Sequence, residues 1–304
     1  MNKLLIAIVF LGCFLLSCNS KQSKNVKQKE QNKDKISTDL NLETVINDTV
    51  IQVPHKTGLI KVYLQSHTSS QLKGTLVLLP GWNFPALDWC SKTDFCRKAK
   101  EQGYQLIMPE MQKSMYANHS YKETRTDLKN VLSRIWFKDT LVKYLQDSMK
   151  LLLPNQINGV CGISSGARGA ALVAMDLPKV FKVAVALSGD FNPSLLQSDN
   201  LMNLFYGKFL QHKQRWLEND NVYSAASTYQ VPILLLHGAQ DNVVSVNQST
   251  SFYNELKRVN PSLKCELIID STAGHNYSYW GKQTGKILSF IDNTCKMKRK
   301  NGIQ

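Results

Sequence analysis

The sequence predicts an α/β fold in which a mostly parallel central sheet is covered by helices on both faces. Short runs of consecutive apolar residues recur along the chain, which is typical of strands buried on both faces of a sheet. Segments with the helical spacing of apolar residues alternate with these runs. The runs lie at residues 74–79, 158–163, 183–187, 231–236 and 265–269.

The first residues of the chain predict export. Lys3 gives a positive start, residues 4–16 are almost wholly apolar, and Leu15-Leu16-Ser17-Cys18 follows. This run is short for a membrane-spanning helix and typical of a signal peptide. Its ending resembles the lipobox of bacterial lipoproteins. The resemblance implies a lipoprotein signal peptide over residues 1–17 and a lipid anchor on Cys18.

The lipobox also implies a location in the bacterial cell envelope, as a membrane lipoprotein. Asn19 stands where an acidic residue would favour the inner membrane, so we expect the outer membrane, on its periplasmic or surface side. A plain signal peptide cut near Ser20, or an uncleaved anchor, stays open as an alternative.

Residues 18–45 are rich in Lys, Gln, Asn and Ser, with almost no large apolar residue before Ile36. Such a segment buries too little apolar surface to order itself, so we predict a flexible tether. Residues 46–304 remain, and they suit one α/β domain with a substantial core.

The formal net charge is +14 and the sequence pI is about 9.4. Much of the excess lies in the tether and in the last residues, where Lys296, Lys298, Arg299 and Lys300 follow closely. The predicted domain is therefore only mildly basic, and it contains no nucleic-acid-binding motif. We expect no nucleic-acid partner, whereas a basic tether and tail suit an anionic membrane surface.

Cysteine usage constrains the redox state. After removal of the signal and lipidation of Cys18, an odd number of cysteines remains, so at least one thiol is expected to be free, and Cys161 in an apolar strand is the candidate. A disulfide could form between Cys90 and Cys96 or between Cys265 and Cys295, and the sequence does not choose between them. No cysteine and histidine spacing is typical of zinc, so we expect neither a metal nor a cofactor.

The predicted elements follow in order. An opening hairpin at residues 49–53 and 59–65 precedes the first buried strand, which ends in Pro80-Gly81-Trp82. Next come a helical stretch at residues 88–103, a strand at 105–108 and an aromatic loop at 109–121, which is expected to lie over the functional site. A helical stretch at 124–153 follows, and it is broken near Asp139-Thr140.

The second half alternates in the same way. After the strand at 158–163 we predict a helix from about Ser165, a strand at 183–187, and a small cap-like excursion rich in aromatic residues. A strand, a helix, a last strand and a closing helix complete the sheet. The excursion spans residues 191–230, the helix 246–259 and the last strand 265–269.

Residues 162–166 read Gly-Ile-Ser-Ser-Gly and follow an apolar strand directly. This Gly-x-Ser-x-Gly spacing is typical of a tight turn from strand to helix that presents the central Ser164 as a nucleophile. The backbone N–H groups of Ser165 and Trp82 are the predicted oxyanion donors, because they follow the two strands that meet at this point. Ser165 is the alternative nucleophile.

An acid and a histidine follow later strands. Asp241 comes after the strand at 231–236, and His275 comes after the last strand, which gives the chain order Ser, Asp, His. We predict Ser164, Asp241 and His275 as the catalytic triad. Asp190 is the alternative acid, and the alternative histidines are His237, His119 and His212.

These residues carry a resemblance to the α/β-hydrolase superfamily from about Leu59 to Asn293. Within it, Gly162 to Ala170, Pro178-x-x-Phe181, Ala186-Leu187-Ser188-Gly189 and Gly274-His275 with Tyr279-Trp280 are similar to the esterase group that includes esterase D, feruloyl esterases and enterochelin esterases. Ala167 departs from the glycine common in that group.

The resemblance implies a serine hydrolase that cleaves small-molecule carboxylic esters through an acyl-enzyme. Aromatic residues in the predicted loops, among them Trp82, Tyr116 and Tyr277, suit an aromatic acyl group or a sugar ester. Two alternatives stay open: a serine peptidase of the same fold, and a lipoprotein that keeps the fold as an inactive binding module.

Overall fold

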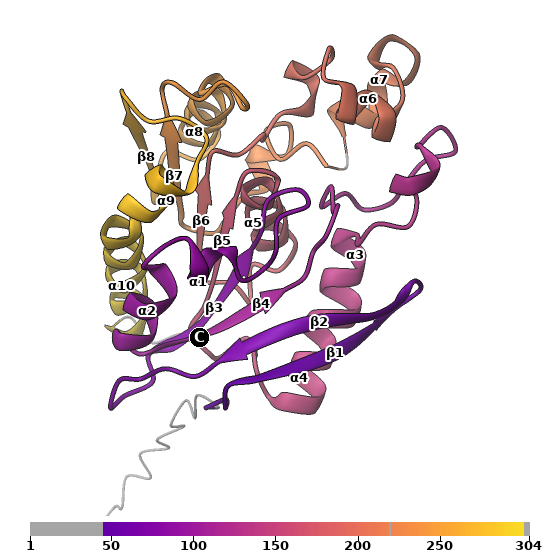
Figure 1. The fold of residues 1–304 in the computed structure, drawn as a ribbon. Helices are drawn as coiled ribbons and strands as arrows, with labels where there is room; N and C mark the ends of the chain where they lie inside the picture. Colours follow the sequence, from indigo (N-terminus) through magenta and orange to yellow (C-terminus); the bar gives the residue numbers. More distant parts are fainter. Residues whose placement is uncertain (1–44, 219, 301–304) are drawn as a thin grey trace, which may run out of the picture. The chain divides into compact units, whose positions relative to one another are not determined.

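Eight strands in the described part of the chain form one sheet, with the order β1-β2-β4-β3-β5-β6-β7-β8 (Figure 1). The pairs β1·β2 and β2·β4 are antiparallel, and every pair from β4 to β8 is parallel. The structure is a computed structural model that describes residues 45–218 and 220–300. The strands are β1 Thr49–His55, β2 Gly58–Gln65, β3 Gly74–Leu79, β4 Tyr104–Pro109, β5 Asn158–Ile163, β6 Val183–Leu187, β7 Ile233–Gly238 and β8 Cys265–Asp270.

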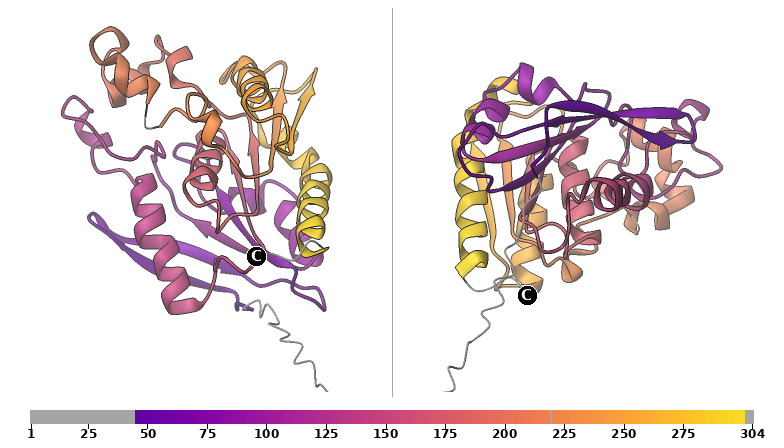
Figure 2. Two further views of the ribbon diagram at one scale, coloured as in Figure 1. Left: turned by 180° about the vertical axis from the view of Figure 1, so that it is seen from behind. Right: turned by 90° about the horizontal axis from the view of Figure 1, so that it is seen from below.

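Helices cover both faces of the sheet, and this explains the apolar runs. In β3, Leu76 and Leu78 pack into one apolar cluster while Val77 and Leu79 pack into another on the opposite face. The helix α10, yellow in Figure 2, lies on one side of the strands, and α3 to α5 lie on the other. The first face carries α1 Asp88–Ser91, α2 Phe95–Glu101, α9 Tyr277–Lys282 and α10 Thr284–Lys300; the second carries α3 Arg134–Trp136, η2 Phe137–Val142, α4 Lys143–Met149, α5 Ser165–Asp176 and α8 Asn247–Val259. The fold is therefore that of an α/β-hydrolase, as predicted.

The cap follows β6 and has its own apolar cluster. The helices α6 Asn200–Tyr206 and α7 Phe209–Leu217 bring Phe205, Tyr206 and Trp216 together with Met115 from the loop after β4. The part of the chain that the structure describes also has three short 3₁₀ turns: η1 Thr126–Leu128, η3 Pro193–Leu195 and η4 Ala226–Thr228. Because Trp82 packs against the same cluster, the cap reaches the turn after β3.

Two helical predictions differ from the structure. The break expected near Asp139-Thr140 is a π-helical segment, η2, inside a helix that runs on from α3 to α4. The stretch 88–103 is divided into α1 and α2 by a turn. A periodic pattern does not report the register change inside η2, because its apolar residues remain on the buried side.

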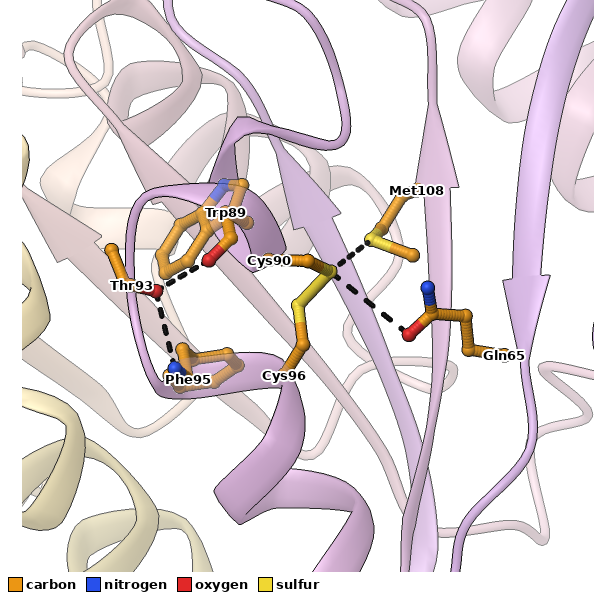
Figure 3. The surroundings of a disulfide bond; sticks show 7 residues. All are labelled: Gln65, Trp89, Cys90, Thr93, Phe95, Cys96 and Met108. Atoms are coloured by element: carbon orange, nitrogen blue, oxygen red, sulfur yellow. Dashed lines mark hydrogen bonds between the residues drawn. A yellow bond between two sulfur atoms is a disulfide. The ribbon is translucent and has the colours of Figure 1, made fainter.

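A disulfide joins Cys90 to Cys96 across the turn between α1 and α2 (Figure 3). Cys90 Sγ also lies 3.3 Å from Met108 Sδ of β4, and Thr93 Oγ1 donates to the Trp89 carbonyl within the bridged segment. Cys161 and Cys265 are buried free thiols, so of the two pairings left open by the sequence only Cys90–Cys96 forms.

The predicted signal peptide, Cys18 and most of the tether lie outside the described residues. Within residues 45–300, the structure has no helix with the length and apolar character needed to cross a membrane.

Candidate active site

Ser164 lies at the turn between β5 and α5 and has a backbone φ of 55°. A positive φ is costly for serine, and here close packing imposes it. A Cβ on Gly162 would come 1.9 Å from the Gly166 carbonyl oxygen, and a Cβ on Gly166 would come 2.4 Å from the Pro80 carbonyl oxygen. Both glycines are therefore required by backbone contact, and together they fix the serine at the carboxyl end of the sheet.

His275 joins Ser164 to Asp241. Its Nε2 lies 3.0 Å from Ser164 Oγ, and its Nδ1 lies 2.7 Å from Asp241 Oδ2. Because the carboxylate accepts, Nδ1 donates, and Nε2 of the neutral ring is then able to accept the serine proton. The imidazole also packs against Trp280 in a T-shaped arrangement, with ring centroids 5.0 Å apart. The structure thus brings together the three residues predicted as a triad.

Asp241, in the loop after β7, is held by four groups from that loop, from β7 and from the loop after β8. Its side chain is fully buried, and Oδ1 accepts hydrogen bonds from the backbone N–H groups of Val243 at 3.0 Å and Val244 at 2.8 Å. His237 Nε2 lies 3.4 Å from Oδ2. Burial works against the charged form, but hydrogen bonds from His237 and His275 hold the pKa of Asp241 well below its ordinary range. The carboxylate is therefore ionised at neutral pH.

The alternative residues lie elsewhere or have other partners. His237 Nε2 donates to the Val244 carbonyl at 2.8 Å, and its Nδ1 accepts from Ser249 Oγ at 2.7 Å, so this ring ties the loop together. Asp190 forms an ion pair with Arg168 at 2.6 Å. His119 packs against Tyr121, and His212 lies in α7.

The turn after β3 is fixed against the nucleophile turn. A Cβ on Gly81 would come 3.1 Å from Ser164 Cβ, so the peptide that leads into Trp82 lies beside the serine. Below this turn, the Tyr116 hydroxyl donates to the Pro80 carbonyl at 2.8 Å, and Trp89 Nε1 donates to the Leu79 carbonyl at 3.2 Å. The predicted oxyanion donors Trp82 and Ser165 thus come from adjacent turns.

The expectation that Tyr116 overhangs the site is wrong. Its side chain is completely buried, because its ring packs against Gly169 in α5 and its hydroxyl supports the turn after β3. Phe84 and Tyr277 are instead half-buried, and both pack against Trp280, the ring that contacts His275. Their own ring centroids are 5.8 Å apart.

Sequence reasoning missed the buried Arg168. This residue lies one turn after Ser164 in α5, is fully buried, and donates both to Asp190 Oδ2 and to the Met115 carbonyl, each at 2.6 Å. One signal was available: an arginine among Gly and Ala residues, in a helix packed closely on a sheet, has to find a buried partner. Among the described residues, no three Asp, Glu, His or Cys side chains gather into a cluster that could hold a metal ion.

Comparisons with known proteins agree with this fold. The S-formylglutathione hydrolase of Agrobacterium tumefaciens has a TM-score of 0.65 at 13% identity, with 83% of this chain and 99% of that chain covered. MPT51 of Mycobacterium tuberculosis has a TM-score of 0.64 at 16% identity, covering 81% and 99%. The substrate-bound fluorophosphonate-binding serine hydrolase F of Staphylococcus aureus has a TM-score of 0.60 at 19% identity, also covering 81% and 99%.

At these identities the solved structures show a common fold. No curated protein sequence matches the chain. The sequence profile of the prolyl oligopeptidase family matches residues 137–298, more than half of the 304 residues. The chain therefore has the α/β-hydrolase fold and belongs to the prolyl oligopeptidase family.

Proposed function

We propose that this protein is a serine hydrolase that cleaves carboxylic esters, with Ser164 as nucleophile, His275 as general base and acid, and Asp241 as the acid that orients it. The observation that carries the proposal is the position of His275 between Ser164 Oγ at 3.0 Å and Asp241 Oδ2 at 2.7 Å. This spacing allows proton transfer without rearrangement.

The reaction has two halves. Ser164 Oγ forms a bond to the ester carbonyl carbon while His275 Nε2 takes the hydroxyl proton. When the tetrahedral intermediate collapses, the alcohol leaves with that proton and an acyl-serine remains. Water then attacks the acyl carbon, His275 takes the proton of the water, and the carboxylic acid leaves as the proton returns to Ser164. Asp241 stabilises the charged imidazole in both halves.

We assign the stabilisation of the oxyanion to the backbone N–H groups of Ser165 and Trp82. The contact of Gly81 with Ser164 supports this assignment, since it brings the turn after β3 next to the reacting oxygen. In enzymes of this kind, one such donor contributes about 10²- to 10³-fold to kcat.

A serine peptidase is the second candidate, and the match to the prolyl oligopeptidase family favours it. The same three residues would cleave an amide by the same steps. The ester proposal comes first because the motifs around Ser164, Ser188 and His275 are similar to those of the esterase group, and because neighbours in structure include an S-formylglutathione hydrolase.

The test is hydrolysis of a matched pair of substrates by the full-length protein. We expect turnover of 4-nitrophenyl butyrate, no comparable turnover of a peptide 4-nitroanilide, and loss of the ester activity in Ser164→Ala. Faster cleavage of the anilide would establish the peptidase instead. Ester turnover that is unchanged in a folded Ser164→Ala protein would contradict both candidates.

We further propose that Cys18 carries the lipid anchor and attaches the protein to the outer membrane. The motif Leu15-Leu16-Ser17-Cys18 supports this proposal. In cells fed an alkyne fatty acid, the wild-type chain should take up the label and sediment with membranes, and Cys18→Ala should do neither. Equal labelling of both chains would exclude lipidation at this cysteine.

A further inference from the structure

A cleft of about 530 Å³ lies between the β1–β2 turn, the loop around residues 118–133 and the helix that begins at α3. Its lining includes His55 and Lys56 from the turn, His119 and Lys129 from the loop, and Ile135 and Trp136 from the helix. None of Ser164, Asp241 and His275 lines it. Its volume lies in the range of clefts that hold small organic ligands.

The charged side chains that line this cleft are all cationic. Its lining contains two lysines and no aspartate or glutamate. Lys56 Nζ donates to the Lys129 carbonyl at 3.4 Å, which places the Lys56 ammonium beside the Lys129 backbone.

The acids on nearby segments are engaged elsewhere. Asp127 binds Arg125 at 2.5 Å, Asp139 lies 3.8 Å from Lys138, and Asp220 is buried with Arg134. Within the described residues, no carboxylate therefore neutralises Lys56 or Lys129. A concave surface with uncompensated cations concentrates anions.

One wall of the cleft is apolar and fixed in place. Trp136 Nε1 donates to the Pro54 carbonyl at 2.7 Å, and the His55 ring meets the indole edge-on with centroids 6.1 Å apart. Beside them, Ile135 leaves 42% of its surface exposed although it belongs to the start of a buried helix. An inorganic anion would contact the lysines and leave this wall in water.

We propose that this cleft binds a small organic carboxylate with an aryl or alkyl body. The carboxylate contacts the ammonium groups of Lys56 and Lys129, and the body covers Ile135 and the edge of Trp136. Binding follows from burial of apolar surface together with charge-assisted hydrogen bonds. The inference is independent of the chemistry proposed for Ser164.

The test is calorimetric titration of the full-length protein with cinnamate, octanoate and the neutral isostere cinnamamide. We expect saturable binding of at least one of the two carboxylates, and affinity for the amide about tenfold lower or worse, because a hydrogen bond to a charged group contributes about 1.5 to 3 kcal/mol. The double variant Lys56→Gln/Lys129→Gln should lose about the same factor.

A control double variant, Lys138→Gln/Lys143→Gln, removes the same amount of charge from the helix beside the cleft, at two positions outside its lining. It should bind as the wild type does. Ile135→Asp should abolish binding without unfolding the protein, since the side chain is exposed; circular dichroism checks the fold. His275→Ala should leave binding unchanged. The proposal is overturned by no binding of either carboxylate, by equal binding of the amide, by wild-type affinity in Lys56→Gln/Lys129→Gln, or by loss of binding in His275→Ala.

Discussion

The loops after β6 and β7 each carry a buried aspartate, and the surroundings of the two acids are opposite. Burial disfavours ionisation of both. For Asp241, hydrogen bonds from His237 and His275 overcome burial, so its pKa is lowered. For Asp190, burial outweighs the attraction of Arg168, so its pKa is raised above the ordinary 3.8. Neighbouring parallel strands thus present two acids at one edge of the sheet, and their partners separate their roles.

The difference teaches that position after a strand does not define a catalytic acid. Arg168 connects Asp190 to the Met115 carbonyl and so joins α5 to the loops after β4 and β6. That contact holds the fold around the nucleophile turn. Asp241 contacts the ring that reaches Ser164, and so it is placed to act on the reaction.

The largest expected effect is on activity: replacing Asp241 should reduce ester hydrolysis far more than replacing Asp190. Asp241→Asn should lower kcat/KM for an ester by about 10⁴-fold, because the amide no longer holds the required imidazole tautomer. Asp190→Asn should lower it by less than about tenfold, because Asp190 contacts Arg168 instead of His275. Steady-state kinetics on both variants, with the fold checked by circular dichroism, measures the comparison. Equal losses of kcat/KM in the two variants would contradict the different roles assigned to Asp241 and Asp190.

The second expected effect is on stability, and it concerns the ion pair between Asp190 and Arg168. Arg168→Met should lower the free energy of unfolding by about 3 to 5 kcal/mol, since it leaves the buried Asp190 without its counter-charge. The double variant Arg168→Met/Asp190→Leu should recover most of this loss. Denaturant titration measures both. A mild effect of Arg168→Met alone would show that the pair does not hold the fold.

The pH dependence of stability should have opposite signs at the two acids. The stability that ionised Asp241 contributes is present above its unfolded pKa of about 3.8 and fades as the pH falls below it. The protonated Asp190 contributes stability below about 3.8, and that contribution is lost as the pH rises through its raised folded pKa.

Unfolding of the wild type, Asp241→Asn and Asp190→Asn should therefore be compared between about pH 7 and pH 3. As the pH falls, the advantage of the wild type should shrink relative to Asp241→Asn and grow relative to Asp190→Asn. The same trend for both variants would refute the assignment of opposite environments.

The smallest effect tests the link between α9, whose Trp280 packs on His275, and the loop after β6. Trp280 packs on His275 and donates to Ser188 Oγ, in the loop after β6, at 3.1 Å. Trp280→Phe keeps an aromatic ring but removes this bond, so we expect a loss of about 1 kcal/mol in stability and only a few-fold loss in kcat. Unchanged stability and kcat would show that α9 and the loop after β6 are independent at this point.

Much of the fold was predictable from the sequence, because strands buried on both faces must be continuously apolar. The run that contains Leu76 and Val77 illustrates this, since consecutive residues enter different cores. The π-helical segment around Asp139-Thr140 and the turn that divides α1 from α2 were not predictable in detail. Both depend on hydrogen bonds and a disulfide that leave no periodic trace.

The sequence predicted the residues of the site, but it predicted less well the contacts that hold those residues in place. Ser164, Asp241 and His275 each follow an apolar strand, and parallel strands bring such residues to one edge. The sequence favoured Asp241 and left Asp190 open, because both residues follow a strand; the distance from His275 Nδ1 to Asp241 Oδ2 decides between them. The burial of Tyr116 depends on how its loop packs against Gly169, which no local pattern reports.

The most direct test of the account is the rate at which a fluorophosphonate labels Ser164 in the full-length wild type, Asp241→Asn and Asp190→Asn, followed by intact mass and peptide mapping. We predict labelling on Ser164 at similar rates in the wild type and Asp190→Asn, and much slower labelling in Asp241→Asn. A folded wild type that is not labelled at Ser164, or labelling that depends on Asp190 and not on Asp241, would contradict the account.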